Sequence, residues 1–249
     1  MKTVDKALKV LDQFSLEVTE VGLSELSRMA ELDKAATRRL LVALGKHGFI
    51  EQSAETRKYR LGPGFLRLAH IREATVPMAQ AAREVCEWLV DEVGETVHVS
   101  VPWDRSMATI AHRLPRRGNV INIDDTQALY FHATSSGLAY LAFTSEEKRN
   151  RLLALKREAV ANSTVTDKTE LLALLATVRE QGYSANTDSF EDGVASMGVP
   201  FYLEPGEPAG TVAIALPSSR FNKKREAEML PALREAVERI EHSLKGFSS

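Results

Sequence analysis

The sequence has 249 residues, of which 44% are hydrophobic and 27% charged, a balance typical of globular proteins with one large or two ordinary domains. A net charge of −2 argues against a general nucleic-acid coat protein. No run of about 18 apolar residues occurs, so we expect no membrane span. Cys86 is the only cysteine, which excludes intrachain disulfides; with no secretory signal at residues 1–10, it favours a cytoplasmic protein.

The charge is distributed unevenly along the chain. Residues 1–70 hold 12 lysines and arginines against 9 acidic residues, a net charge of +3. The remaining 179 residues hold 20 against 25, a net charge of −5. This asymmetry suits a small module that faces DNA, attached to an acidic body.

Two helices are predicted at the start of the chain. The first has an apolar face with three- and four-residue spacing, formed by Val4, Ala7, Leu8, Val10, Leu11 and Phe14. The second begins at residues 23–24, with Ser24 as its expected N-cap. Its inner face is formed by Leu26, Met29 and Ala30.

A third helix is predicted from Lys34, with Asp33 as its N-cap. Four of its residues have the spacing of a face that points into a core: Thr37, Leu40, Leu41 and Leu44. The opposite face carries Ala35, Arg38, Arg39, Val42 and Lys46. Residues 34–48 contain no acidic residue, so the outward face suits a polyanion.

Two short strands, at 49–52 and 57–61, are predicted after the third helix, around a turn at 53–56. Alternation places Lys58 and Arg60 on the solvent face of this hairpin. Such an arrangement is typical of a winged helix-turn-helix, whose third helix enters the major groove of double-stranded DNA. The residues expected to contact DNA are Ser24, Lys34, Ala35, Thr37, Arg38, Arg39, Lys46, Lys58 and Arg60. A protein-interaction module without DNA affinity is the alternative for these residues.

The rest of the chain predicts a linker helix and an α/β domain, which makes the protein an α+β multidomain chain. The expected domains are a winged helix-turn-helix at 1–64, a linker helix at 65–77 and a second domain at 78–249. The helices expected in the second domain lie at 78–93, within 129–143, and at 146–155, 168–181 and 223–245. The strands expected there lie at 96–101, 107–113, 120–123, 194–202 and 210–215.

No residue set in the second domain predicts catalysis or metal binding. The sequence has no nucleophile elbow, zinc-binding HExxH, CxxC or phosphate-binding glycine loop. His98, His112 and His132 are too widely spaced for a local chelate, and Cys86 lies in a helical pattern that favours packing. We therefore expect no catalytic residues, no metal and no cofactor. An enzyme that processes a small acid and carries a DNA-binding appendage is the alternative function.

Several blocks of sequence, in order along nearly the whole chain, resemble the IclR family of bacterial regulators. They are residues 22–27 (GLSELS), 32–41 (LDKAATRRLL), 59–63 (YRLGP), 94–98 (GETVH), 132–142 (HATSSGLAYLA), 182–183 (GY), 188–193 (DSFEDG) and 199–200 (VP). The sequence departs from the family pattern in two places, one of them a pair of residues. Asp33 stands where the family usually has proline, and Ala35 and Ala36 stand where it has a Ser-Thr pair that would reach DNA phosphates.

The resemblance implies a GAF-like effector-binding second domain. We expect a repressor that forms a homodimer or homotetramer on a near-palindromic operator, with an activator as the alternative. The resemblance places a pocket for a small organic carboxylate between a loop that opens a helix near Gly137 and a facing segment. The matching positions are Ser135, Ser136, Asn186, Ser196, Ala213 and Ala215. We expect the apolar wall of this pocket to be formed by Trp103, Met107 and Tyr130.

Overall fold

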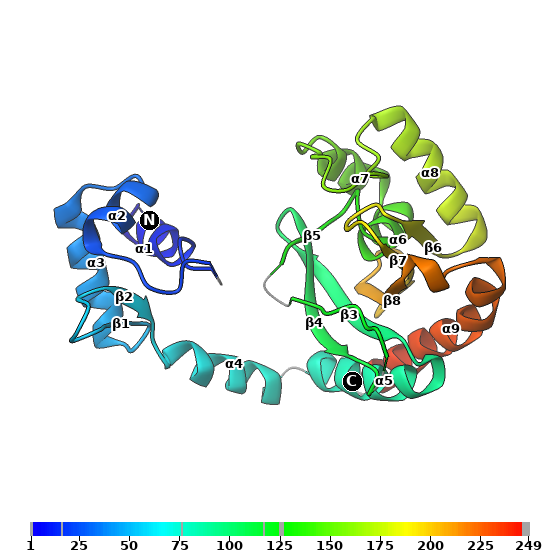
Figure 1. Ribbon diagram of the computed structural model, residues 1–249, viewed down its shortest axis with the longest axis horizontal. Coiled ribbons are helices and arrows are strands. Elements are labelled where there is room, and N and C mark those ends of the chain that lie inside the picture. Colours follow the sequence, from blue (N-terminus) through cyan, green and yellow to red (C-terminus); the bar gives the residue numbers. More distant parts are fainter. Residues whose placement is uncertain (1, 16, 76, 117, 125–126, 246–249) are drawn as a thin grey trace. The chain divides into compact units, whose positions relative to one another are not determined.

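The structure is a computed structural model that describes residues 2–15, 17–75, 77–116, 118–124 and 127–245 (Figure 1). The chain divides into two compact units, Met1–Val76 and Pro77–Ser249. Each unit has hydrophobic clusters of its own. No helix among the described residues is long and apolar enough to cross a membrane.

The first unit has three helices around a small core. They are α1 (Lys2–Leu11), α2 (Leu23–Met29) and α3 (Lys34–Lys46). The buried residues of this core are Val10, Val21, Leu26, Ala30, Leu40, Leu41 and Ile50. The apolar face predicted for the first helix is only partly buried, because Val4 and Leu8 are 65% and 54% exposed.

The predicted start of α3 is confirmed, and that of α2 is corrected. Oδ1 of Asp33 accepts a hydrogen bond from the amide of Ala36 at 2.7 Å, so Asp33 is the N-cap of α3. Gly22, with an extended backbone, holds the N-cap position of α2. Ser24 lies inside the first turn of that helix, so the N-cap predicted for Ser24 is wrong.

A two-stranded wing and a fourth helix complete the first unit. β1 (Ile50–Gln52) pairs antiparallel with β2 (Tyr59–Leu61), and α4 (Gly64–Thr75) follows. After β2, the chain passes close to the residues that follow α3. A Cβ atom at Gly62 would lie 2.3 Å from the carbonyl oxygen of Gly48, so only glycine fits there.

The second unit is built on an antiparallel sheet with the strand order β5-β4-β3-β8-β7-β6 among the described residues. The strands are β3 (Thr96–Trp103), β4 (Ser106–Arg113), β5 (Leu129–Tyr130), β6 (Ser184–Thr187), β7 (Val194–Phe201) and β8 (Gly210–Pro217). The strand predicted at 120–123 is wrong, because that segment has no strand structure. β5 and β6 were not predicted; each is short and is defined by its pairing with a neighbouring strand.

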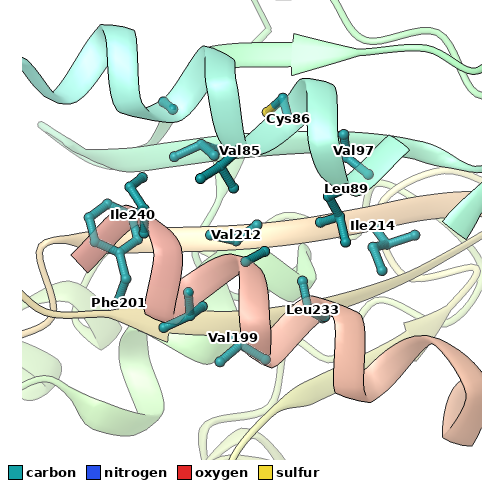
Figure 2. Close-up of a cluster of buried hydrophobic side chains, with 14 of the residues drawn as sticks. Val85, Cys86, Leu89, Val97, Val199, Phe201, Val212, Ile214, Leu233 and Ile240 are labelled. Atoms are coloured by element: carbon teal, nitrogen blue, oxygen red, sulfur yellow. The ribbon is translucent and has the colours of Figure 1, made fainter. Parts of the chain in front are cut away.

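Helices cover both faces of this sheet. α5 (Pro77–Val93) and α9 (Lys223–Lys245) pack on one face, where their apolar side chains meet those of the strands in the main core (Figure 2). Cys86 lies in this core, and burial raises the pKa of its thiol to about 12, so it is a packing residue. α6 (Ser135–Phe143) packs on the other face against β7 and β8. Two further helices, α7 (Glu146–Leu153) and α8 (Lys168–Gln181), follow α6 in the chain.

The first turn of α6 lies very close to its surroundings because two glycines make room for it. A Cβ atom at Gly137 would lie 2.4 Å from the Cα atom of Phe131. A Cβ atom at Gly198, on β7, would lie 2.9 Å from the carbonyl oxygen of Ser135. These contacts fix the start of α6 against the middle of the sheet.

Candidate DNA-binding surface and ligand pocket

The outward face of α3 is an exposed, positively charged surface. A shallow depression over this face is lined by Leu23, Lys34, Ala35, Arg38, Arg39 and Val42. Lys46 is also exposed at the end of the helix. In the part of the chain that the structure describes, none of these cations forms an ion pair, so their charges are available to an anionic partner.

Thr37 lies on the opposite side of α3. Its side chain is fully buried, and its hydroxyl donates a hydrogen bond to the carbonyl oxygen of Asp33 at 3.0 Å. The helical pattern predicted this inward direction. The expectation that Thr37 contacts DNA is therefore corrected, because its side chain does not reach the outward face of α3. Ser24 is exposed in the first turn of α2.

The two cations of the wing differ in their surroundings. Nε of Arg60 lies 2.6 Å from Oε1 of Glu51, and Nη1 lies 3.4 Å from Oε1 of Glu20. These carboxylates, chiefly that of Glu51, raise the pKa of Arg60 and offset its charge. Lys58 is exposed and forms no ion pair within the described ranges.

A cavity of about 60 Å³ lies in the second unit, beside the start of α6. Since one water molecule needs about 10–15 Å³ on this scale, the cavity has room for several waters or a small organic molecule. Residues from five strands, α6 and two loops meet there. They are His98, Ile121, Asn122, Ile123, Asp124, Gln127, Leu129, Thr134, Ser135, Ser136, Asn186, Phe190, Glu191, Val194, Ser196 and Ala215.

Five of the nine residues predicted for the pocket line this cavity, and four do not. Trp103 is 71% exposed at the turn between β3 and β4. Met107 is fully buried in the cluster beside α6, and Tyr130 is 37% exposed and makes an edge-type ring contact with Phe190. Ala213 is buried in β8 but does not reach the cavity.

The apolar wall predicted from Trp103, Met107 and Tyr130 is therefore corrected, because the first and last of these side chains are exposed and Met107 is buried in a separate cluster. The apolar lining comes instead mainly from residues that were not predicted to belong to the pocket. It consists of Ile121, Ile123, Leu129, Phe190 and Val194.

The first turn of α6 supplies the polar end of the cavity. The hydroxyl of Thr134 caps the helix by accepting a hydrogen bond from the amide of Gly137 at 3.0 Å. The amides of Ser135 and Ser136, in the first turn, have no acceptor within the helix itself. Aligned amides at a helix start attract carboxylates.

A serine–asparagine network holds this turn to the sheet. The Ser135 hydroxyl donates to the carbonyl oxygen of Ser196 at 2.8 Å, and the Ser196 hydroxyl lies 2.8 Å from both Oγ of Ser135 and Oδ1 of Asn186. The side-chain amide of Asn186 donates to the carbonyl oxygen of Ala133 at 3.2 Å. Most of the hydrogen bonds that these groups can form are made within the network. Their role is therefore to shape the cavity and to hold the start of α6 in place.

His98 is a lining residue that the sequence analysis did not assign to the pocket. It lies on β3, and its Nε2 atom is 3.1 Å from Oγ of Ser136. Burial, with a smaller effect from His112, lowers the pKa of His98 to about 4, so the ring is neutral near pH 7. Its Nδ1 atom is buried and has no hydrogen-bond partner among the described residues. Alternation along β3 places His98 on the face of the sheet opposite to Val97 and Val99, which is the face that α6 covers.

The contact between Ser136 and His98 is a nucleophile–base pair in its geometry, which the sequence alone did not predict. A histidine with so low a pKa is a weak base near pH 7, and within the described residues no carboxylate binds its Nδ1 atom. The described lining of the cavity contains Asp124 and Glu191 but neither lysine nor arginine. No group of His, Cys, Asp and Glu side chains among the described residues is arranged to hold a metal ion.

Comparison with known proteins covers both units of the chain. The IclR helix-turn-helix domain matches residues 3–54, and the C-terminal domain of the bacterial transcriptional regulator IclR matches residues 73–242. The chain belongs to the IclR family. IclR-family proteins are transcriptional regulators with a DNA-binding helix-turn-helix and an effector-binding domain, and the two matched regions lie in the two units of this chain.

Individual IclR-family proteins align over nearly the full chain. The HTH-type transcriptional regulator XynR of Escherichia coli is 26% identical over 95% of this chain and 94% of its own length. The transcriptional repressor IclR of E. coli is 26% identical over 92% of this chain and 84% of its own length. The crystal structure of an IclR regulator from Silicibacter sp. TM1040 has a TM-score of 0.88 and 36% identity, covering 98% of this chain and 96% of that one.

Proposed function

We propose that this protein is a cytoplasmic repressor of transcription that binds a near-palindromic DNA operator and responds to a small organic acid in the cavity beside α6. The observation that carries the DNA-binding function is the outward face of α3, where Lys34, Arg38, Arg39 and Lys46 are exposed and unpaired among the described residues. The departure from the family pattern at Ala35 and Ala36 supports a larger role for these cations, since alanine has no hydroxyl for a phosphate.

DNA binding is tested by fluorescence anisotropy with DNA from upstream of the gene for this protein, beside a scrambled duplex, over a salt series. We expect a strong preference for the native fragment. Replacing both Arg38 and Arg39 by alanine weakens binding at least tenfold. It also reduces the salt slope, which is the slope of the logarithm of the binding constant against the logarithm of the salt concentration, by about 2, since each phosphate contact contributes about 1. The matched control replaces Lys156 and Lys224, two exposed lysines of the second unit, and leaves the slope unchanged.

We infer that the effector is a small monocarboxylate. Its carboxylate would lie at the Ser135 and Ser136 amides, and the unpartnered Nδ1 atom of His98 would meet a second polar group. A helix start carries only about half a positive charge. With Glu191 in the lining and neither lysine nor arginine in its described part, a dicarboxylate is disfavoured.

A panel of mono- and dicarboxylates tests this inference by thermal shift and by calorimetry. 4-Hydroxybenzoate is a suitable first member, because an IclR homologue from Microbacterium hydrocarbonoxydans was crystallised with it; that structure has a TM-score of 0.84 and 24% identity. We expect monocarboxylates to bind more tightly than their dicarboxylate analogues and the Ser136→Ala variant to bind them more weakly. Tighter binding of the dicarboxylates would contradict the proposal.

Oligomerisation on DNA is also part of this proposal. A near-palindromic operator requires two copies of α3, so we expect a dimer or a tetramer. Light scattering of the purified protein gives the number of chains, and footprinting gives the spacing between half-sites. A monomer bound to a single half-site would contradict this part.

The contact between Ser136 and His98 makes hydrolysis of a small ester the second candidate function. The low pKa of His98 counts against it, because the ring binds a proton weakly. Release of nitrophenolate from p-nitrophenyl acetate, compared between the native protein and Ser136→Ala, separates the two candidates. We expect equal background rates; a rate that depends on Ser136 would favour the enzyme.

A further inference from the structure

The outward face of α3 contains an apolar strip between its cations. Val42 is 54% exposed, although valine is a residue that cores normally bury. Ala35, seven residues earlier, is exposed on the same face. Both residues line the shallow depression over the helix together with Arg38 and Arg39.

The geometry of the helix places this strip near the middle of the outward face. With 3.6 residues in each turn, residues seven apart differ in direction by about 20°. The core direction is given by the buried residues Thr37, Leu40 and Leu41, and Ala35 and Val42 point roughly opposite to it. Arg38 lies about 60° to one side of Ala35, and Arg39 lies about 40° to the other side.

This pattern matches the cross-section of a DNA major groove. Phosphates form both walls of the groove and attract the flanking arginines, whereas base edges form its floor. The apolar group that a base presents on this floor is the 5-methyl group of thymine. Ala35 has only a methyl side chain, so the helix can approach the floor closely enough for the larger Val42 to reach it.

We propose that Val42 contacts a thymine methyl group in each operator half-site and thereby selects thymine at one position. This inference rests on the proposed DNA-binding function and adds a base preference that the cations alone do not provide. The arginines hold the helix in the groove, and Val42 favours thymine over bases that lack a methyl group at that position.

Substitution of uracil for thymine tests the proposal, because it removes one methyl group and leaves base pairing intact. Each thymine of the footprinted operator half-site is replaced in turn by uracil, and Kd is measured for the native protein and for Val42→Ala. We expect one thymine at which uracil weakens binding of the native protein about threefold to fivefold, the effect of exposing a methyl-sized apolar group. The Val42→Ala variant binds the thymine duplex more weakly by a similar factor and does not respond to uracil at that position.

The matched control is Val160→Ala, which truncates a valine of the second unit that is 38% exposed. This variant keeps the response of the native protein to uracil. If native protein and Val42→Ala respond equally to uracil at every position, the proposal is overturned while DNA binding stands. If the native protein does not prefer the unmodified operator to scrambled DNA, the proposed function fails and the inference fails with it.

Discussion

Nε2 of His98 lies 3.1 Å from Oγ of Ser136, so a buried polar contact joins the middle of the sheet to the first turn of α6. Both residues line the cavity, and both are almost fully buried. His98 lies on β3 between strands β4 and β8 and contacts α6 through Ser136, and its burial disfavours a positive charge on the ring. The state of His98 therefore links the stability of the second unit to pH.

We predict that acid destabilises the second unit through His98. The pKa of His98 is about 4 in the folded protein, against 6.5 for the ordinary side chain, so the unfolded chain binds the proton more readily between these values. The free energy of unfolding then falls as pH drops through this window, by about 1 kcal/mol between pH 7.5 and 5.5. Urea denaturation followed by tryptophan fluorescence measures it, because Trp88 and Trp103 both lie in this unit.

The control for this prediction is His98→Gln, which keeps a polar side chain but has no proton to gain in this range. Between pH 7.5 and 5.5, the free energy of unfolding of this variant falls by about 1 kcal/mol less than that of the native protein. The pKa of His132 is also lowered by burial, so some dependence remains in the variant. Identical pH profiles for the two proteins would show that His98 does not titrate as described.

We predict that the N-cap of α3 depends on the hydrogen-bonding capacity of Asp33 and not on its charge. Asp33→Ala loses the bond to the Ala36 amide and destabilises the start of the helix by about 1 kcal/mol, whereas Asp33→Asn keeps an acceptor and loses little. Hydrogen exchange of peptides covering residues 34–46 measures the opening of this helix. Equal exchange in the two variants would contradict the cap.

We predict that Gly137 cannot be replaced without moving α6. The Cβ atom of Gly137→Ala would meet the backbone of Phe131, and we expect a loss of about 3 kcal/mol in the free energy of unfolding. Gly94→Ala is the comparison, because Gly94 has a φ of +66° but open space around it, and backbone strain alone costs about 1 kcal/mol. Tm values of the two variants rank the effects; a milder effect at Gly137 would mean that α6 has room to shift.

We predict different roles for the two cations of the wing. Lys58→Ala reduces the salt slope of DNA binding by about 1, because the lysine is free to meet a phosphate. Arg60→Ala changes the slope much less, because Glu51 and Glu20 already bind the guanidinium. Anisotropy over the same salt series compares the two variants. A larger loss from Arg60→Ala would show that it leaves its carboxylates on binding DNA.

The sequence predicted the elements whose signals are local. α3 and α8 begin after Asp33 and Asp167, whose carboxylates accept the bonds expected of N-caps, and the long periodic pattern of α9 was found over its full length. β5 and β6 were missed, because strands of two and four residues carry little pattern of their own. Their pairing partners decide their structure.

The pocket was predicted only in part, because its lining also depends on contacts between segments that are distant in the sequence. Ser135, Ser136, Asn186, Ser196 and Ala215 were found through the family resemblance. The wall formed by residues 121–124, 127, 129, 190, 191 and 194 was missed, because sequence composition does not show which loops fold over the start of a helix. Trp103 illustrates the reverse error, since a large apolar side chain suggests burial but here lies exposed at a hairpin turn.

The most direct test of the account is the effect of a cavity ligand on the affinity for the operator. A carboxylate is first selected because it raises the Tm of the native protein and not that of Ser136→Ala. Operator Kd is then measured by anisotropy with and without a saturating amount of this ligand, for both proteins. The account predicts that the ligand weakens operator binding at least fivefold for the native protein, and that without ligand Ser136→Ala binds the operator as the native protein does. An unchanged Kd for the native protein with the cavity occupied would contradict the claim that this cavity controls DNA binding.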